Sequence, residues 1–157
     1  MIGIKTEIYS RIEKMPSVDE TNFFHSRQLF LISSATPKMK PYMVVCCDES
    51  GAVVSQLLAV VRYRTTLIPP FLFMHCRIVG EGTYAESSYR HDELFGEMLS
   101  AITRKLNKTT LYIEVSDLSQ KMFAYRQFRQ SDYFPVHWMS IHNSLHSKTP
   151  EERISEK

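Results

Sequence analysis

Residues 77–82 read Arg-Ile-Val-Gly-Glu-Gly, an order in which one arginine and two glycines could surround a phosphate group. Glycine allows a positive φ and lets backbone N–H groups approach an anion closely. A strongly patterned helix follows, and its N-terminal end would favour the same charge. However, residues 83–90 separate Gly82 from that helix, and Glu81 places a negative charge in the loop. A pattern with three fixed positions also fits a simple glycine turn. Arg77, Gly80 and Gly82 are therefore either a phosphate-binding loop or a turn.

Carboxylates and tyrosines are the candidate groups for proton transfer. Glu114 lies in an apolar, β-branched run, where a carboxylate is either paired or has a raised pKa, and both situations occur at catalytic sites. An ion pair with an arginine is the simpler interpretation. Glu81 and Glu86 flank the glycine loop, and Tyr84 or Tyr133 could protonate a leaving group.

Two other groups of residues do not form a metal site or a catalytic pair. His137, His142 and His146 suggest a metal, yet the first two face opposite sides of an expected strand and no cysteine pair accompanies them at zinc spacing. His75 and Cys76 are adjacent on another expected strand and point apart, so they cannot act together as base and nucleophile. The sequence therefore predicts neither a metal site nor a cysteine nucleophile.

Length and composition indicate one soluble domain. With 157 residues the chain can build a single core, and no apolar run approaches the roughly 18 residues of a membrane helix. The N-terminal residues lack the features of a secretion signal, so a cytoplasmic location is expected. The odd number of cysteines (Cys46, Cys47 and Cys76) favours buried thiols over disulfides.

The charge pattern does not predict nucleic-acid binding. The formal net charge is only +2, too small to favour nucleic acid by itself. The nearest candidate cluster contains Lys121, Arg126 and Arg129 beside Tyr125 and Phe128, and we interpret it as a solvated helix face.

The first third of the chain predicts one strand and one helix. Apolar and polar residues alternate in 2–9, with Ile2, Ile4 and Ile8 on one side of the expected strand. Thr21 or Asn22 can open a helical stretch through Ile32, and Pro37 ends it.

An antiparallel meander follows. The β-rich runs 41–47 and 52–63 predict a hairpin in which Gly51 takes the positive φ of a tight turn. A third run, 71–79, begins after Pro69 and Pro70, residues that do not fit inside a central strand.

The second half predicts a helix, a strand and a second helix. The first helix has a core-facing stripe at steps of one, three and four, made of Leu94, Phe95, Met98, Leu99, Ile102 and Leu106. Residues 109–115 are expected to form a buried central strand. Ser116 or Asp117 can then cap a helix over 118–128. An extended stretch to about residue 145 follows, and Pro150 could begin another helix.

This order resembles the fold of the GNAT (Gcn5-related N-acetyltransferase) superfamily, an α/β (α+β) fold with a mixed central sheet, an antiparallel meander and flanking helices. More narrowly, several segments in order resemble the N-terminal half of bacterial tandem-domain proteins related to the FemABX aminoacyltransferases. These segments are FFHS at 23–26, PPFLF at 69–73, the glycine loop at 77–84, KMFAYRQFR at 121–129 and the stretch 133–153.

The resemblance implies a specific organisation and function. Residues 1–147 would be one GNAT-like domain, and 148–157 would start a connector to a second half. The substrate would lie in the cleft between the halves, and an acyl or aminoacyl group would pass from acyl-CoA or aminoacyl-tRNA to an amine. The chain alone would mainly bind substrate, with no permanently bound cofactor.

The GNAT resemblance also implies the alternatives. In members that use acetyl-CoA, the pattern at Arg77, Gly80 and Gly82 meets the pyrophosphate, so the chain could be a complete small N-acetyltransferase. It could also be a non-catalytic domain that uses the fold to bind a partner. Glu114 as base and Tyr133 as acid are the expected catalytic candidates.

Overall fold

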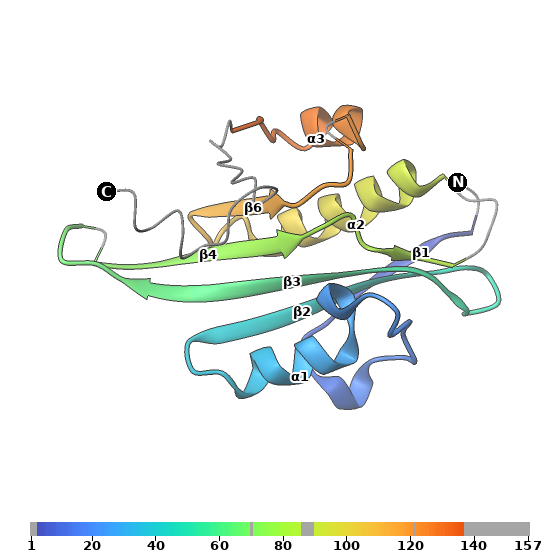
Figure 1. Ribbon diagram of the computed structural model, residues 1–157, viewed down its shortest axis with the longest axis horizontal. Coiled ribbons are helices and arrows are strands. Elements are labelled where there is room, and N and C mark those ends of the chain that lie inside the picture. The colour runs from blue at the N-terminus through green and yellow to red at the C-terminus, as the bar shows by residue number, and fades with distance from the viewer. Residues whose placement is uncertain (1–2, 70, 86–89, 121, 137–157) are drawn as a thin grey trace, which may run out of the picture.

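The computed structural model describes residues 3–69, 71–85, 90–120 and 122–136. The elements in these ranges are β1 (Lys5–Tyr9), the 3-10 helices η1 (Ile12–Lys14) and η2 (Phe23–His25), α1 (Arg27–Ala35), β2 (Met39–Cys47), β3 (Val53–Thr65), β4 (Leu72–Val79), β5 (Thr83–Tyr84), α2 (His91–Leu106), β6 (Tyr112–Ser116) and α3 (Tyr125–Gln130). Figure 1 shows the long strands side by side across the molecule.

The described strands form one mixed sheet. Its order is β1-β2-β3-β4-β6, and β5 pairs with β3. The first four strands are antiparallel neighbours, whereas β6 runs parallel to β4 from His75↔Tyr112 to Val79↔Ser116. Parallel neighbours require a crossover connection, and α2 supplies it. The mixed sheet with a meander and flanking helices confirms the fold class expected from the sequence.

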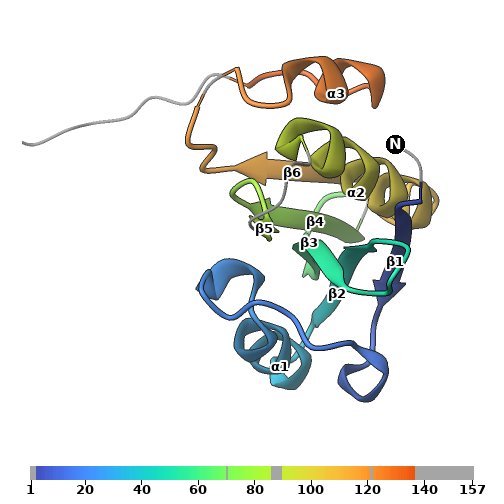
Figure 2. The same cartoon turned by 90° about the vertical axis from the view of Figure 1, so that its right-hand side faces the viewer.

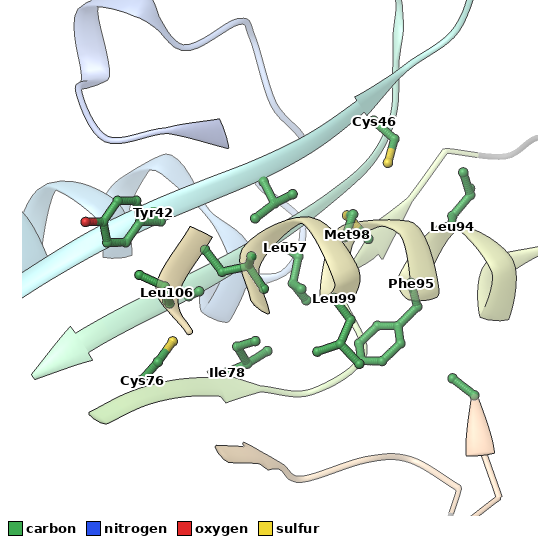
Figure 3. Packing of buried hydrophobic residues seen from close by; sticks show 14 of the residues in the cluster. Tyr42, Cys46, Leu57, Cys76, Ile78, Leu94, Phe95, Met98, Leu99 and Leu106 are labelled. Carbon is green, nitrogen blue, oxygen red and sulfur yellow. The ribbon is translucent and has the colours of Figure 1, made fainter. Parts of the chain in front are cut away.

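Helices cover the sheet on two sides (Figure 2). The α2 stripe predicted from spacing is fully buried against the sheet, and Figure 3 shows part of that cluster between α2 and the strands. On the opposite face, α1 covers Met43, Val45 and Leu58 with Phe30. Each large apolar side chain removed from water stabilises the fold by about 1.5–3 kcal/mol. Two layers of helices therefore hold β2 and β3 at the centre.

The predicted hairpin between β2 and β3 is confirmed. Gly51 has a φ of 84°. The Asp48 carboxylate accepts hydrogen bonds from the backbone N–H groups of Ser50 and Ala52 at 2.9 and 3.0 Å. An aspartate that bonds its own turn in this way fixes the strand register.

The helix expected from Thr21 or Asn22 is divided in two. Asn22 does cap a helix, but only the 3-10 turn η2, where its Oδ1 accepts from the Phe24 N–H at 3.1 Å. The α-helix begins after Ser26, whose Oγ accepts from the Leu29 N–H at 3.1 Å. A serine cap competes with the helix that would otherwise run through it. The predicted end before Pro37 is confirmed, because α1 ends at Ala35.

Two expectations after α2 were wrong. β6 is not a buried central strand among the described residues, because it ends the sheet order and Tyr112 is 46% exposed. Ser116 is the last residue of β6 and neither it nor Asp117 caps a helix; α3 begins only at Tyr125. Ala124 precedes α3 in a left-handed conformation, so the chain turns sharply before the helix starts.

Some predictions concern residues outside the described ranges. These are the features at Ile2, Pro70, Glu86 and Lys121, the stretch from 137 to 145, the three histidines at 137, 142 and 146, and the connector at 148–157. Among the described residues, no helix is long and apolar enough to cross a membrane.

Candidate functional site

The glycine loop joins the carboxyl end of β4 to β5. Gly80 has a φ of 83° and Gly82 a φ of 98°, values that favour glycine. A Cβ atom on Gly82 would lie 2.9 Å from the carbonyl oxygen of Gln56, closer than the backbone tolerates. A Cβ atom on Gly80 would meet only the His25 ring, at 3.6 Å. Glycine is therefore required at position 82 by space as well as by conformation.

The amide groups of both glycines point into the protein. The Gly80 N–H donates to the Ser116 carbonyl at 2.7 Å, which extends the β4–β6 pairing beyond the strand ends. The Gly82 N–H is directed at Nε2 of His25 at 3.0 Å. An anion cradle needs N–H groups that converge on the ligand. In this conformation neither glycine offers one.

His25 is the functional-site residue that spacing alone did not reveal. Its ring is fully buried, and Nδ1 lies 3.0 Å from the Leu58 backbone nitrogen, which donates to it. Burial lowers the pKa of His25 to about 4, so the ring is neutral at pH 7. The only sequence signal was its place in FFHS, a segment that carried the family resemblance but no chemical pattern. Through His25, that segment contacts Leu58 of β3 and Gly82 of the glycine loop.

Glu81 bridges the glycine loop to the segment after β6. Its carboxylate accepts hydrogen bonds from the backbone N–H of Ser119 at 2.8 Å and from the Ser119 hydroxyl at 2.6 Å. The Gln120 N–H is 3.4 Å from the same oxygen. The Tyr84 hydroxyl donates to the Glu81 carbonyl. The negative charge in the loop is thus already held by backbone N–H groups of a second loop.

Glu114 has the arginine partner that the simpler interpretation expected. It lies opposite Arg77 in the parallel register, with Glu114 Oε1 3.8 Å from Arg77 Nε. Arg77 also lies 3.9 Å from the Asp117 carboxylate and donates to the Ser116 hydroxyl at 3.4 Å. The Arg77 side chain is 40% exposed, so solvent can reach this pair. Arg77 therefore faces carboxylates rather than an empty anion position.

Tyr133 is not brought together with Glu114. Its hydroxyl is 2.8 Å from Thr103 Oγ1 on α2, and its ring packs against Phe128. Burial raises the pKa of Tyr133 to about 12. The ring contacts the core cluster on the α2 side of the sheet, whereas Glu114 alternates with Ile113 and Val115, which contact that cluster. The sheet separates the two candidates.

Tyr84 also has a structural environment. Its ring stacks on His91 with centroids 4.2 Å apart, and burial raises its pKa above the ordinary value. The neutral phenol at pH 7 acts here as a donor to the glycine loop. Tyr84 thus supports the loop, at the junction with the first turn of α2.

Another group of charged and aromatic side chains lies on the same face of the sheet as α1, outside the area that the helix covers. We call it the arginine face: Arg62 and Arg64 of β3, Phe73 and His75 of β4, and Tyr112 of β6. The His75 ring stacks on Tyr112 at 5.2 Å. Cys76 points to the opposite side into the α2 core, as expected for adjacent strand residues. His75 and Cys76 therefore do not form a catalytic pair.

The described residues contain neither a cluster of metal ligands nor a reactive cysteine. No group of three or more histidine, cysteine, aspartate or glutamate side chains there could hold a metal ion. The three cysteines are free thiols, and burial raises the pKa of Cys76 to about 12. A thiol with so high a pKa is a poor nucleophile at pH 7.

Comparison with family models and with curated protein sequences gives no match. Solved structures do match. A mutant of the BH1408 protein from Bacillus halodurans aligns over 85% of this chain and 80% of its own, with 14% identity and a TM-score of 0.55. A candidate acetyltransferase from Agrobacterium tumefaciens aligns over 84% and 85%, with 12% identity and a TM-score of 0.50.

These likenesses concern the fold, since the identities are low. The mixed sheet with its flanking helices is the fold of GNAT-type acetyltransferases. The fold expected from the resemblance is therefore confirmed. A shared fold does not fix an activity, so any assignment must come from the residues of the site.

Proposed function

We propose that this chain is the substrate-binding first half of a FemABX-type N-acyltransferase, which works with a second GNAT-like half to transfer an acyl or aminoacyl group to an amine. One observation carries the proposal: the amides of Gly80 and Gly82 are directed inward. A pyrophosphate would find the Gly80 amide already hydrogen-bonded to Ser116 and the Gly82 amide facing the buried His25 ring. The acyl donor, either acyl-CoA or aminoacyl-tRNA, is therefore assigned to the second half.

In this proposal, residues 1–147 form the domain and 148–157 begin the connector. Arg77, Gly80 and Gly82 shape one wall of the substrate cleft and bind no cofactor permanently. Glu114 is the candidate base for the ammonium proton, because it is partly exposed and lies two residues before the carboxyl end of β6. Tyr133 supports α2 and is not the acid.

Acyl transfer to an amine needs a base, donors for the developing oxyanion and an acid for the leaving group. Among the described residues, Glu114 lies on one side of the sheet and Tyr133 on the other. A single cleft cannot use both. This separation favours a domain that binds the amine and leaves part of the chemistry to its partner.

A complete acetyl-CoA-dependent N-acetyltransferase is the second candidate. The observation that favours it is the position of the glycine loop, which follows the carboxyl end of a strand and has a positive φ at both glycines. Ligands in α/β sheets bind at such ends. In this case Glu81 would have to leave Ser119 before a phosphate could enter. A non-catalytic binding domain is the third candidate, and activity in the presence of a second half would exclude it.

Calorimetric titration of the whole chain with acetyl-CoA and with CoA tests the proposal. We expect no saturable binding, whereas micromolar binding, about −8 kcal/mol, would favour the complete enzyme. Glu81→Gln serves as the matched variant, because it removes the competing charge and keeps an acceptor for Ser119. If the loop is a phosphate cradle, this variant should bind CoA more tightly than the wild type.

Turnover provides the second readout. Thiol release from acetyl-CoA is followed in the presence of a panel of small amines. The proposal predicts no release above the background of the donor alone. Release at ordinary enzyme rates, on the order of 1 s⁻¹ or faster, would overturn it.

A further inference from the structure

The arginine face carries cationic groups that the proposed acyl transfer does not yet use. Arg62 lies directly opposite His75 across β3 and β4, and His75 lies opposite Tyr112 across β4 and β6. Arg64 lies opposite Phe73 in the next same-face position. Directly opposed residues share one face of a sheet and lie about 5 Å apart. Two arginines and an imidazole therefore gather between two aromatic rings.

These arginines differ from Arg77 in their partners. Arg77 lies within 4 Å of the carboxylates of Glu114 and Asp117. Within the described ranges, Arg62 and Arg64 have no ion pair. Nε of Arg62 is buried without a hydrogen-bond partner, as is Nε of Arg77, but only Arg77 has carboxylates nearby to offset this. A buried donor that stays unpaired costs about 1–3 kcal/mol. An acceptor supplied by a ligand would remove that cost.

His75 adds an independent indication of a ligand. Its side chain is only 3% exposed, yet Nδ1 has no hydrogen-bond partner among the described residues. Burial, then the charges of Arg64 and Arg62, lower the pKa of His75, so the ring is neutral at pH 7. A neutral ring can still donate one hydrogen bond. Its position between the rings of Phe73 and Tyr112 holds that donor in place.

Resting on the proposed function, we infer that the arginine face binds an oxyanion carried by the amine substrate, either a carboxylate or a phosphate. Arg62 and Arg64 would supply the charge-assisted hydrogen bonds, and His75 the neutral one. The aromatic rings would contact the apolar part of the substrate.

The neighbouring carboxylates orient the substrate and set its length. Glu114 is level with Arg77, two residues along β4 from His75. Two strand residues span about 7 Å. Arg62 and Glu114 also lie two strands apart in the sheet, so their backbones are about 12 Å from each other. A substrate with its oxyanion at Arg62 and its ammonium at Glu114 would therefore have to span that distance less the reach of the two side chains. Glu114 and Asp117 would repel a continuous phosphate backbone, which favours a small amine over a nucleic acid.

Nuclear magnetic resonance titration of the whole chain tests this inference without any acyl donor. The probes are 5-aminovalerate for a carboxylate, 3-aminopropyl phosphate for a phosphate, and pentylamine and propylamine as matched amines without an oxyanion. We expect at least one oxyanion probe to bind roughly tenfold more tightly than its matched amine, the effect of one good charged contact. The arginine side-chain Nε–Hε signals of Arg62 and Arg64 should shift.

Variants test whether the arginine face is responsible for the tighter binding of the oxyanion probes. The double change Arg62→Gln with Arg64→Gln should abolish the preference, whereas Arg104→Gln, an exposed arginine on α2, should leave it unchanged. Arg64→Gln alone repeats the test if the double variant does not fold, since Arg64 is exposed. His75→Phe keeps the ring stack and should weaken the oxyanion probe about threefold to tenfold, within the range of a neutral hydrogen bond.

Three results would overturn the inference. One is equal affinity for each oxyanion probe and its matched amine, including no binding of either. Another is a preference that persists in the double variant. The third is a single-stranded RNA oligonucleotide that binds more tightly than every small probe and is lost in the double variant, because the face would then be a nucleic-acid surface. None depends on CoA binding, so failure here is distinct from failure of the proposed function.

Discussion

The Nε2 atom of His25 lies 3.0 Å from the backbone nitrogen of Gly82, across 57 residues of sequence. The other ring nitrogen faces the Leu58 N–H at the same distance. A neutral imidazole accepts a hydrogen bond through one nitrogen only, so the ring accepts from one of these amides at a time. One buried histidine thus lies between β3 and the glycine loop, within hydrogen-bonding distance of both.

Protonation of His25 should destabilise the protein. Its pKa is about 4 in the folded state against 6.5 for an unperturbed histidine. Between these values the unfolded chain binds a proton that the folded protein does not, so the free energy of unfolding falls as the pH falls. The full difference corresponds to about 3 kcal/mol. Urea unfolding at pH 7.5, 5.5 and 4 should show this loss relative to His25→Gln, and parallel curves for the two proteins would contradict it.

Gly82 and Gly51 form a matched pair for testing the glycine loop. Both have a positive φ, but a Cβ atom would collide with the Gln56 carbonyl only at Gly82 and would meet nothing within 4 Å at Gly51. Gly51→Ala should cost about 1 kcal/mol for conformation alone. Gly82→Ala should cost roughly 2–4 kcal/mol, because overpacking adds to the strain. Urea unfolding measures both, and equal losses would show that the loop relaxes freely.

Periodicity predicted the parts of the fold that bury apolar side chains. The six stripe residues of α2 are all buried, because a 3.6-residue repeat has one way to face a core. Gly51 was predictable because a tight hairpin needs its positive φ. The boundaries around Asn22 and Ser26 were not, since either residue can cap a helix and both do, Asn22 for η2 and Ser26 for α1.

The site was harder to predict because its contacts join distant segments. Glu114 opposite Arg77 required the parallel register of β4 and β6, which no local pattern encodes. Tyr133 was a candidate acid by residue type, yet its place beside Thr103 depends on how α3 returns to α2. His25 had no spacing partner at all in the sequence. The positions of these three residues depend on tertiary contacts and not on local propensity.

Removing the Glu81 carboxylate should release the segment after β6. Glu81→Ala leaves the Ser119 N–H without its acceptor. We expect a loss of less than about 1 kcal/mol in the free energy of unfolding, since the contact is exposed, but at least roughly tenfold faster amide exchange at Ser119. Glu97→Ala, an exposed carboxylate on α2, is the control and should change neither. Unchanged exchange at Ser119 would show that Glu81 does not hold this segment.

The hydroxyl groups of Tyr133 and Thr103 should act as a stabilising pair. Tyr133→Phe removes one partner of the 2.8 Å contact and should lower the free energy of unfolding by about 0.5–1.5 kcal/mol. The double-mutant cycle with Thr103→Val should give a coupling energy of about 1 kcal/mol. If Tyr133 were instead a catalytic acid, Tyr133→Phe would lower kcat of the assembled transferase with little effect on unfolding.

Neutralising Glu114 should have little effect on stability and a larger one on binding. Its pair with Arg77 is partly exposed at 3.8 Å, so Glu114→Gln should change the free energy of unfolding by less than about 1 kcal/mol. The same change removes the anion that would hold the substrate ammonium, so 5-aminovalerate should bind roughly threefold to tenfold more weakly. Asp132→Asn, an exposed carboxylate after α3, is the control and should leave that affinity unchanged. Tighter binding by Glu114→Gln would mean that Glu114 repels the oxyanion instead of holding the amine.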